Sequence, residues 1–568
     1  MSAAGLFFLK GASLELGLQQ GLIDTTQQAV GAKRAARRVI LRENQRLTLG
    51  ARYETLLFFP VIKHLWRPCH LVSYSSCELR ALTGKRYAFA TIDRHLREMT
   101  QCRLAQAIGD TLARCYYQAW YAPDQMAASP DHPLEPYVFY LDTHNKRVWS
   151  VHNLPRGMVK GQSAPCLRQV FLHGRGGHAL YSETYPGDMK LPQVAVGVIT
   201  NFERALGQRA VYVVVVDREG LSVELFKALG RCGAYIVTLL KSNQYAGVAD
   251  FEAMTEARSL VDERTGITTH RVAEGTLRCS NGGLIRCAVA RDLDNGKLVV
   301  FATTVPSALE PDSLWIARWY LRRWNAQENS FRYLVAFVHL DTNFGLHHKR
   351  SVPNRVLARK RDRWEHAVAT QRRKHASQHA KLAKLAAQIK RLEDREAAAL
   401  ATLAGHRLQE RGTLRRQQQR AQVHKRLGRW VEQRCDLQRH IEAHAQKITV
   451  LEQALAGLDA SAALYEIDPE KDQLMTHLKV ALANSALYAR QHYFGAKYQR
   501  ALPQTLQRLF FSQEGYVEES ACTIRVTLDA YRDLTLQLDA IEACRNFNQR
   551  HVLTLDGKVI EMHVADPK

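Results

Sequence analysis

The chain has 568 residues, of which 46% are hydrophobic and 24% are charged. This composition is typical of a soluble globular protein, and the length predicts three or more domains. No apolar run approaches the roughly 18–20 residues that cross a bilayer, and the N-terminus lacks the pattern of a secretion signal, so we expect a cytoplasmic protein with no membrane partner. The 11 cysteines include no C-x-x-C pair, which argues against a zinc ribbon. The net charge of +24 indicates a polyanionic partner, of which nucleic acid is the most common.

Residues 1–125 are predicted to form a basic, helical domain that binds DNA. Two short helices are expected at 77–82 and 90–97 around a turn at Gly84, a spacing that could place the second helix in a major groove. Plain packing of two helices explains the same pattern equally well. A proline-rich linker is expected over 123–136.

Residues 133–245 are predicted to be the first part of an α/β core. Asp142 and Asp217 each end an apolar strand, and Lys241 follows the last strand. Because the chemistry of such sheets gathers at the carboxyl ends of central strands, both aspartates are candidate catalytic residues, although an aspartate after a strand is often only a turn former. Strands are expected over 137–141, 146–152, 166–172, 178–185, 211–216 and 234–240, with helices over 191–206 and 224–229.

Residues 246–305 contain glycine-bounded β segments and predict an inserted β unit. The next segment, 306–348, is predicted to hold an amphipathic helix over 311–340 with Asp312 or Ser313 as its N-cap. The expected apolar stripe of this helix consists of Leu314, Ala317, Leu321, Trp324, Glu328, Phe331, Val335 and Val338. Glu328 is its one charged member, and a buried carboxylate must find a cation, a metal ion or a hydrogen-bond donor. Arg332 at i+4 offers a plain salt bridge. The alternative is a triad of acids formed with the two aspartates.

Three carboxylates on one surface repel each other unless cations neutralise them, and Mg²⁺ is the expected ion. Two Mg²⁺ ions, with Mn²⁺ as a substitute, held by Asp142, Asp217 and Glu328 could support an in-line phosphoryl transfer. Trp319 is expected to offer a stacking face, whereas Trp324 is expected in the core. Nearby cations and hydrogen-bond donors are predicted to contact DNA, with solvated surface as the alternative for the arginines and the lysine: Lys241, Tyr320, Arg322, Arg323, Asn329 and Arg332.

Residues 349–460 are predicted to form an antiparallel coiled-coil hairpin, because leucine and isoleucine heptads recur and residues 355–460 contain no proline. Residues 355–460 contain 24 lysines and arginines against 11 aspartates and glutamates. A solvated face, an arm that binds the DNA backbone and a dimer-forming arm all fit this excess. Residues 461–568 are predicted to be a C-terminal α/β region, with a helix over 472–493 and a β-hairpin turning at Asp556-Gly557. They show no catalytic constellation.

Two motifs resemble the DDE transposases of bacterial insertion sequences. The run from Val216 to Gly220, VDREG, is similar to the family's second aspartate in an apolar strand. The run from Arg323 to Tyr333, RWNAQENSFRY, resembles the sequence R-W-x-Q-E-N-x-F-[RK]-Y of one subgroup, with one extra residue between Trp324 and Gln327. Tyr320, Arg323 and Glu328 resemble the family's Tyr–Arg–Glu signature, except that four residues rather than three separate Arg323 from Glu328. The lysine usually found seven positions after the glutamate is replaced by Val335, so its role is not carried over. The resemblance covers about residues 137–345.

The resemblance implies a ribonuclease-H-like core whose metal ligands are Asp142, Asp217 and Glu328. It also implies a homodimer on paired DNA ends, acting in the bacterial nucleoid. The predicted fold is therefore an α/β ribonuclease-H-like core with a β insertion, a helical N-terminal domain and a long antiparallel coiled-coil hairpin.

The predicted function is that of a DNA transposase that binds transposon ends and catalyses metal-dependent cleavage and transfer of strands to target double-stranded DNA. One alternative is a ribonuclease-H-like nuclease or resolvase that cuts without strand transfer. The other is a catalytically inactive, basic coiled-coil DNA-binding protein.

Overall fold

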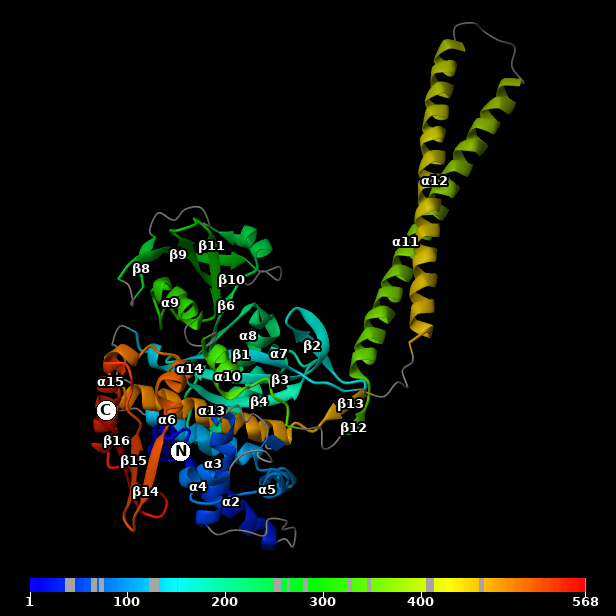
Figure 1. Ribbon diagram of the computed structural model, residues 1–568. Helices are drawn as coiled ribbons and strands as arrows, with labels where there is room; N and C mark the ends of the chain where they lie inside the picture. Colours follow the sequence, from blue (N-terminus) through cyan, green and yellow to red (C-terminus); the bar gives the residue numbers. More distant parts are fainter. Residues whose placement is uncertain are drawn as a thin grey trace. The chain divides into compact units, whose positions relative to one another are not determined.

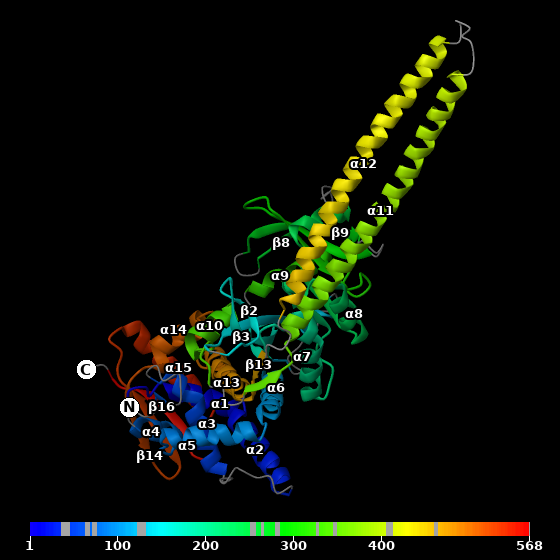
Figure 2. The same cartoon turned by 90° about the vertical axis from the view of Figure 1, so that its right-hand side faces the viewer.

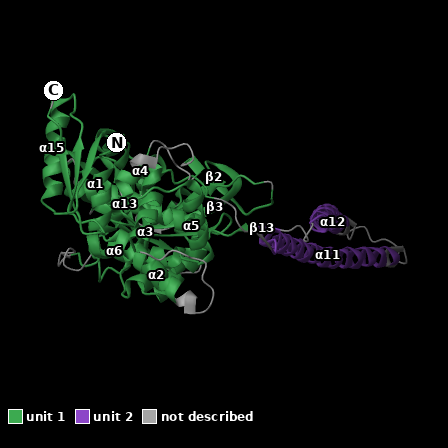
Figure 3. Ribbon diagram, turned by 60° about the horizontal axis from the view of Figure 1, so that its bottom comes forward, with its two compact units in different colours: residues 1–350, 466–568 green, residues 351–465 purple. Residues whose placement is uncertain are grey.

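The computed structural model describes residues 1–35, 46–62, 69–70, 76–121, 132–150, 152–249, 257–262, 266–278, 284–324, 329–344, 349–404, 413–458 and 464–566. The chain divides into two compact units (Figure 3). Unit 1 comprises residues 1–350 and 466–568, and unit 2 comprises residues 351–465. The candidate catalytic residues Asp142 and Asp217 belong to unit 1.

Five strands of unit 1 form the part of the sheet that positions the candidate site (Figure 1). β1 (Val138–Arg147), β3 (Gln162–Gly174) and β4 (Ala179–Pro186) pair antiparallel in the order β4-β3-β1. β5 (Val213–Val216) is parallel to β1, and β6 (Tyr235–Leu239) is parallel to β5. The order β4-β3-β1-β5-β6 is compatible with a ribonuclease-H-like fold. The short β2 (Arg156–Val159) adds to the outer part of β3.

The strand β1 is longer than the sequence pattern predicted. Two separate strands were expected over 137–141 and 146–152, but residues 138–147 form one continuous strand. Its second half stays extended because β3 runs beside it as far as the pair Arg147–Cys166, although its parallel neighbour β5 has already ended.

The segment predicted as a β insertion extends the same sheet. Its strands are β7 (Val248–Ala249), β8 (Arg258–Val261), β9 (Thr268–Arg278), β10 (Leu284–Asp292) and β11 (Leu298–Thr303). β11 pairs antiparallel with β6, which makes one sheet of 11 strands. Strand β6 therefore has a neighbour on each side.

Helices cover both faces of the core strands because the strand residues are apolar in both directions. Val214 and Val216 point into a cluster shared with α7 (Leu191–Leu206) and α8 (Val223–Arg231). Val213 and Val215 point the other way, into a cluster shared with α9 (Ser313–Arg323). The bounds of α7 are those predicted from the sequence.

The helix predicted over 311–340 is described as α9 and α10 (Asn329–Val338), and residues 325–328 lie outside the described part of the chain. Asp312 is the N-cap of α9, as predicted, because its side chain accepts a hydrogen bond from the Leu314 backbone N–H. The predicted apolar stripe was wrong in phase. Of the expected stripe residues Leu314, Ala317, Leu321 and Trp324, Ala317 alone is buried. The other buried residues of α9 are Ser313, Ile316, Trp319 and Tyr320.

The N-terminal region is helical, as predicted. Its helices are α1 (Leu6–Glu15), α2 (Leu18–Ala35), α3 (Arg46–Phe58), α4 (Ser76–Thr83), α5 (Phe89–Gln101) and α6 (Ala105–Tyr121). Gly84 lies between α4 and α5 with a φ of +75°, which suits glycine and ends α4 at the predicted turn. Whether α5 enters a DNA groove stays a prediction.

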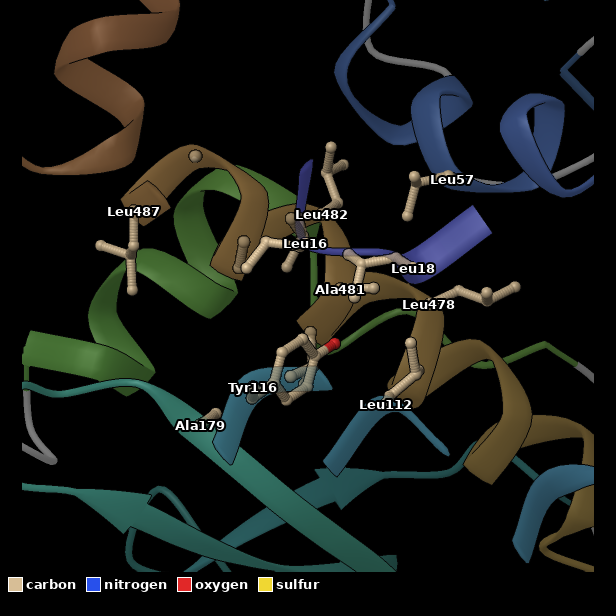
Figure 4. Close-up of a cluster of buried hydrophobic side chains, with 14 of the residues drawn as sticks. Leu16, Leu18, Leu57, Leu112, Tyr116, Ala179, Leu478, Ala481, Leu482 and Leu487 are labelled. Carbon is tan, nitrogen blue, oxygen red and sulfur yellow. The ribbon is translucent and has the colours of Figure 1, made fainter. Parts of the chain in front are cut away.

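Helix α13 (Glu470–His492) is the central helix of unit 1. Of its 23 residues, 18 are buried, and it packs against α1, α6, α10 and β4. Figure 4 shows four of its side chains among apolar side chains of the N-terminal helices and loops. The labelled residues are Leu478, Ala481, Leu482 and Leu487 of α13, with Leu16, Leu18, Leu57, Leu112 and Tyr116 of the N-terminal region and Ala179 of β4.

The C-terminal residues form α14 (Pro503–Leu506), a three-stranded sheet and α15 (Leu534–Asn548). The strands are β14 (Gly515–Glu519), β15 (Thr523–Leu528) and β16 (Val559–Val564). The predicted β-hairpin at Asp556-Gly557 is wrong in part. The turn is present, with φ +83° at Gly557, but the residues before it make only one bridge, between Leu553 and Val559, and β16 instead pairs in parallel with β15.

Unit 2 consists mainly of two long helices, α11 (Arg355–Ala404) and α12 (Thr413–Ala456), which lie side by side in Figure 2. They run antiparallel, because Arg372 pairs with Glu452 and Glu396 pairs with His424. The supercoil of these helices stays a prediction. The strands β12 (Lys349–Val352) and β13 (Leu464–Ile467) pair in a separate two-stranded sheet. None of the described helices is long and apolar enough to cross a membrane.

Candidate active site

Asp142 and Asp217 lie next to each other on neighbouring parallel strands. The register of β1 and β5 pairs Leu141 with Val216, so the residues that follow are adjacent. Asp217 comes directly after the last residue of β5. The sequence predicted that Asp142 ends its strand, but Asp142 lies inside β1, opposite Phe171 of β3. Its parallel neighbour β5 ends at Val216, so Asp142 has a strand partner in β3 and none in β5.

Backbone groups hold one oxygen of each carboxylate. The Thr143 backbone N–H donates to Asp142 Oδ1 at 2.7 Å, and the Arg218 backbone N–H donates to Asp217 Oδ1 at 2.7 Å. The Thr238 hydroxyl on β6 donates to the carbonyl oxygen of Asp217 at 3.0 Å, which fixes the chain where it leaves β5. The Oδ2 atoms of both aspartates are thereby directed away from these backbone donors.

Helix α9 presents Tyr320 and Arg323, one turn apart, to the two aspartates. Arg323 Nη2 lies 3.0 Å from Asp142 Oδ2 and 3.6 Å from Asp217 Oδ2, so one guanidinium nitrogen contacts both carboxylates. The Tyr320 hydroxyl donates to Asp217 Oδ1 at 3.1 Å, and its ring stacks on Phe301 of β11. The candidate site is therefore two carboxylates around one shared cation, with a tyrosine that orients one of them.

The site is sheltered but open on one side. The side chain of Asp142 is 19% exposed and that of Asp217 is 46% exposed. Burial raises the pKa of Asp142, an effect that the Arg323 charge opposes and the Asp217 charge adds to. Burial alone would lower the pKa of Arg323, but the charges of Asp142 and Asp217 raise it above its usual value. Burial, followed by the Asp217 charge, raises the pKa of Tyr320. Arg323 thus stays charged and Tyr320 stays protonated at neutral pH.

The third predicted acid, Glu328, lies outside the described residues. Helix α9 ends at Arg323 and α10 begins at Asn329. Glu328 belongs to the four residues between them, 325–328, that the structure does not describe. Within the described part of the chain, no group of three or more histidine, cysteine, aspartate and glutamate side chains could hold a metal ion. The triad itself therefore remains a prediction, of which the structure brings two members together.

The two described carboxylates fit the predicted Mg²⁺. Both direct an oxygen toward the same positive group, the Arg323 guanidinium. Carboxylate oxygens are the ligands that Mg²⁺ and Mn²⁺ prefer. Asp142 and Asp217 would hold the metal, and Arg323 would have to turn away from at least one of them.

The other predicted DNA-binding residues fall in different places. Arg322 is paired with Glu135 at 2.6 Å, and Lys241 is exposed just after β6. Asn329 and Arg332 line a groove of about 430 Å³. The other lining residues are His144, Trp324, Phe331 and Val335.

Trp319 of α9 and Trp324, the C-cap of that helix, exchange their predicted environments. Trp319, which was expected to offer a stacking face, is fully buried, whereas Trp324, which was expected in the core, is 63% exposed in that groove. The cause is the phase of the apolar stripe. Trp324 is thus the described indole that an external ring could reach near the site.

One positioning pair was missed by the sequence reasoning. Arg168 of β3 pairs with Glu219 at 2.8 Å, and Glu219 also accepts a hydrogen bond from the Leu191 backbone N–H at the start of α7. Glu219 belongs to the Asp-Arg-Glu-Gly turn, so this pair anchors the turn that follows Asp217. No local pattern could have linked residues 51 positions apart.

Comparison with known proteins gives little beyond this geometry. No protein-family model and no curated protein sequence matches the chain. A solved structure of piggyBac transposase, in a synaptic complex with hairpin DNA, aligns with 12% sequence identity and a TM-score of 0.28. The alignment covers 59% of this chain and 68% of that one.

Proposed function

We propose that the chain is a DNA transposase of the DDE type, which cleaves strands at the ends of a mobile element and joins the freed 3′-hydroxyl to target DNA. The observation that carries this proposal is the pair Asp142 and Asp217 on adjacent parallel strands, sharing one cation from α9. The order Asp, Asp, Glu along the chain and the Gln-Glu-Asn run that includes Glu328 support it.

Each residue of the candidate site has a distinct proposed role. Bound Mg²⁺ would supply activation of the attacking oxygen and stabilisation of the leaving one. Asp142, Asp217 and Glu328 would be the ligands. Tyr320 would keep the Asp217 carboxylate oriented through its hydrogen bond. Arg323, displaced from the carboxylates, would turn its charge to a phosphate of the DNA.

The proposed partners follow from the charge and from the reaction. A net charge of +24 favours a polyanion, and joining an element's two ends to a target requires both ends to be held at once. We therefore propose double-stranded DNA as the substrate and a homodimer on the paired ends, acting in the bacterial cytoplasm.

The test is a strand-transfer assay with the purified chain. The DNA carries the sequences that flank the coding region, a supercoiled plasmid serves as target, and Mg²⁺ or Mn²⁺ is added. The wild type should give joined products. Asp217→Asn and Glu328→Gln should reduce them by at least about a thousandfold, because removal of a metal ligand removes the transition-state charge stabilisation. Asp294→Asn, an exposed turn residue of the β10–β11 loop, is the matched control and should retain activity.

The same assay separates the alternatives. Cleavage without joined products would identify a ribonuclease-H-like nuclease. DNA binding without cleavage would identify an inactive DNA-binding protein, an outcome that one observation favours: Arg323 already neutralises both aspartates, as a purely structural ion pair would. Cleavage that survives Glu328→Gln would remove that residue from the site.

A further inference from the structure

The buried apolar side chains of unit 2 pack between its own two helices. Val368, Leu385 and Ile389 of α11 and Ile441 of α12 are buried along the seam where the antiparallel helices meet. Trp364 and Trp430 are half-buried, each with a cation above its ring, Lys360 at 4.5 Å and Arg426 at 5.0 Å. The surface that this unit offers to a partner is therefore mainly polar and charged.

Seven cations follow one side of α11 and are here called the basic stripe. They are spaced by three, four or sums of three and four residues, so they lie on one side of the seam. The uncharged residues at the same spacing between them are Ala367, Thr370, Ser377 and Gln388, so the side contains no acid. All seven are exposed. The basic stripe consists of Lys360, Arg363, Lys374, Lys381, Lys384, Arg391 and Arg395.

The other side of α11 has a different charge pattern. It contains Asp362, Glu365 and Glu393 together with Arg372 and Lys390, so its charges nearly cancel. Arg372 pairs with Glu452 of α12 at 2.6 Å, which shows which side of α12 lies along this mixed edge. The excess positive charge of the hairpin is thus concentrated on the edge that carries the basic stripe.

Helix α12 continues the positive charge on that edge. Arg426, Arg429 and Lys447 lie at the positions of α12 that flank the seam on the side away from Glu452. Asp436 is the acid at these positions, and its carboxylate pairs with Arg439. Among the described residues, no member of the basic stripe forms an ion pair, so the described part of the chain offers its charges no acidic partner.

We propose that the basic stripe binds the phosphate backbone of duplex DNA without regard to sequence. Its span from Lys360 to Arg395 is about 53 Å at 1.5 Å per residue, which matches the length of about 15 base pairs. Lysine and arginine ends at regular spacing provide phosphate contacts but no pattern of base-reading side chains. An anionic membrane fits less well, because such helices need an apolar face to insert and here that face is used in the seam.

This binding surface goes beyond the proposed strand transfer, since it needs neither Asp142 nor a metal ion. It would give the chain affinity for any duplex, including target DNA. The inference can therefore fail while the proposed chemistry holds, and the reverse is equally possible.

The test measures DNA affinity of the full-length chain against salt. Fluorescence anisotropy with a 30-base-pair duplex of arbitrary sequence (about two stripe lengths) gives the dissociation constant at several NaCl concentrations. The variant K374Q/K381Q/K384Q should bind at least about tenfold more weakly at 0.1 M salt. The slope of log K against log [salt] should become shallower by about 2.7, because each lost phosphate contact removes about 0.9.

The matched control is R372Q/K390Q/K425Q, which removes the same number of charges from the mixed edge and from the outer surface of α12. It should change the affinity less than about twofold at the same salt. Far-ultraviolet circular dichroism checks that both variants keep their helices. The titrations are made in EDTA, so that affinity is measured without the metal-dependent chemistry, which separates this surface from the catalytic proposal.

Each of the following results would overturn the inference: a stripe variant that binds DNA like the wild type, equal losses in the stripe and control variants, or a stripe variant that loses binding only to vesicles of anionic phospholipid. The last result would identify a membrane surface as the partner. Duplex RNA of equal length serves as a further competitor. Preference for RNA over DNA by more than about tenfold would also reject duplex DNA as the partner.

Discussion

At the scale of single residues, the negative charge of Asp142 is unfavourable in the folded protein. Its carboxylate is buried, and the neighbouring Asp217 charge works against it, so its pKa is raised despite the contact with Arg323. A group that a reaction needs in one protonation state is often kept in such an unfavourable place. The neutral, isosteric asparagine should therefore be better tolerated by the fold than the native residue.

Asp142→Asn is expected to raise the free energy of unfolding at pH 7, by on the order of 1 kcal/mol, while abolishing strand transfer. The folded-state pKa of Asp142 lies above the unfolded value of about 3.9. The destabilisation of the wild type is thus fully present above the folded pKa and disappears as the pH falls through it toward 3.9. Urea unfolding of both proteins between pH 8 and pH 4 measures the difference, which should shrink toward acid pH. A variant less stable than the wild type at pH 7 would contradict this account.

The site could be predicted from the sequence only in part at this scale. The strand-end position of Asp217 and the turn after it follow from a local apolar run. The role of Arg323 does not, because its carboxylate partner Asp142 lies 181 residues away. A local pattern showed a cation beside the candidate acid, and only the fold shows which acids it contacts.

At the scale of elements, local periodicity correctly predicted helices whose apolar residues lie on one face. Helix α7 has a clear apolar face and begins and ends as expected. Helix α9 was misplaced in phase because apolar residues occur all around it, including Leu314, Trp315 and Leu321, so several stripes fit equally well. The packing of Trp319 against the sheet decides between these stripes, and the local sequence does not show such a tertiary contact.

A buried ion pair joins β1 to α13 and offers an element-scale test. Lys146 Nζ lies 2.6 Å from Asp472 Oδ1, and the two side chains are 1% and 4% exposed. Lys146→Met should lower the free energy of unfolding by about 3–5 kcal/mol, because it leaves the Asp472 carboxylate buried without its cation.

The double variant K146M/D472L provides the control for this pair. It should recover most of the lost stability, because two apolar side chains replace the charges together. Equilibrium urea unfolding measures all three proteins. If the double variant were less stable than Lys146→Met, the buried pair would be a net stabiliser in its own right.

At the scale of the whole molecule, the least predictable feature was the place of α13. Its sequence shows a helix, but nothing in it shows that residues 470–492 fill the centre of unit 1 among the N-terminal helices. The charge pattern of unit 2 was visible in the sequence as an excess. The Arg372–Glu452 pair aligns the two helices and shows that the excess positive charge lies mainly on one edge.

Buried histidines should make the whole of unit 1 sensitive to acid. Burial lowers the pKa of His95, His173 and His178 to about 3 and that of His477 to about 4. Below the unfolded-state value of about 6.5 the unfolded chain takes up protons that the folded chain does not, so stability falls with pH down to the folded values. Each histidine should contribute about 1.4 kcal/mol per pH unit.

The measurement is urea unfolding followed from pH 7 to pH 5. His173→Leu should make the fall shallower by about 1.4 kcal/mol per pH unit, since its ring nitrogens have no hydrogen-bond partner among the described residues. His366→Gln, on the exposed surface of α11, should leave the slope unchanged. An unchanged slope in His173→Leu would mean that His173 is protonated in the folded protein.

The pairing of β11 with β6 has a consequence for solubility during folding. Without the inserted strands, β6 would end the core sheet with a row of unsatisfied backbone groups beside the apolar residues Val237 and Leu239. Such an edge recruits other chains into intermolecular sheets. The insertion thus acts as a cover against aggregation, and any shortening of it has to leave β11 in place.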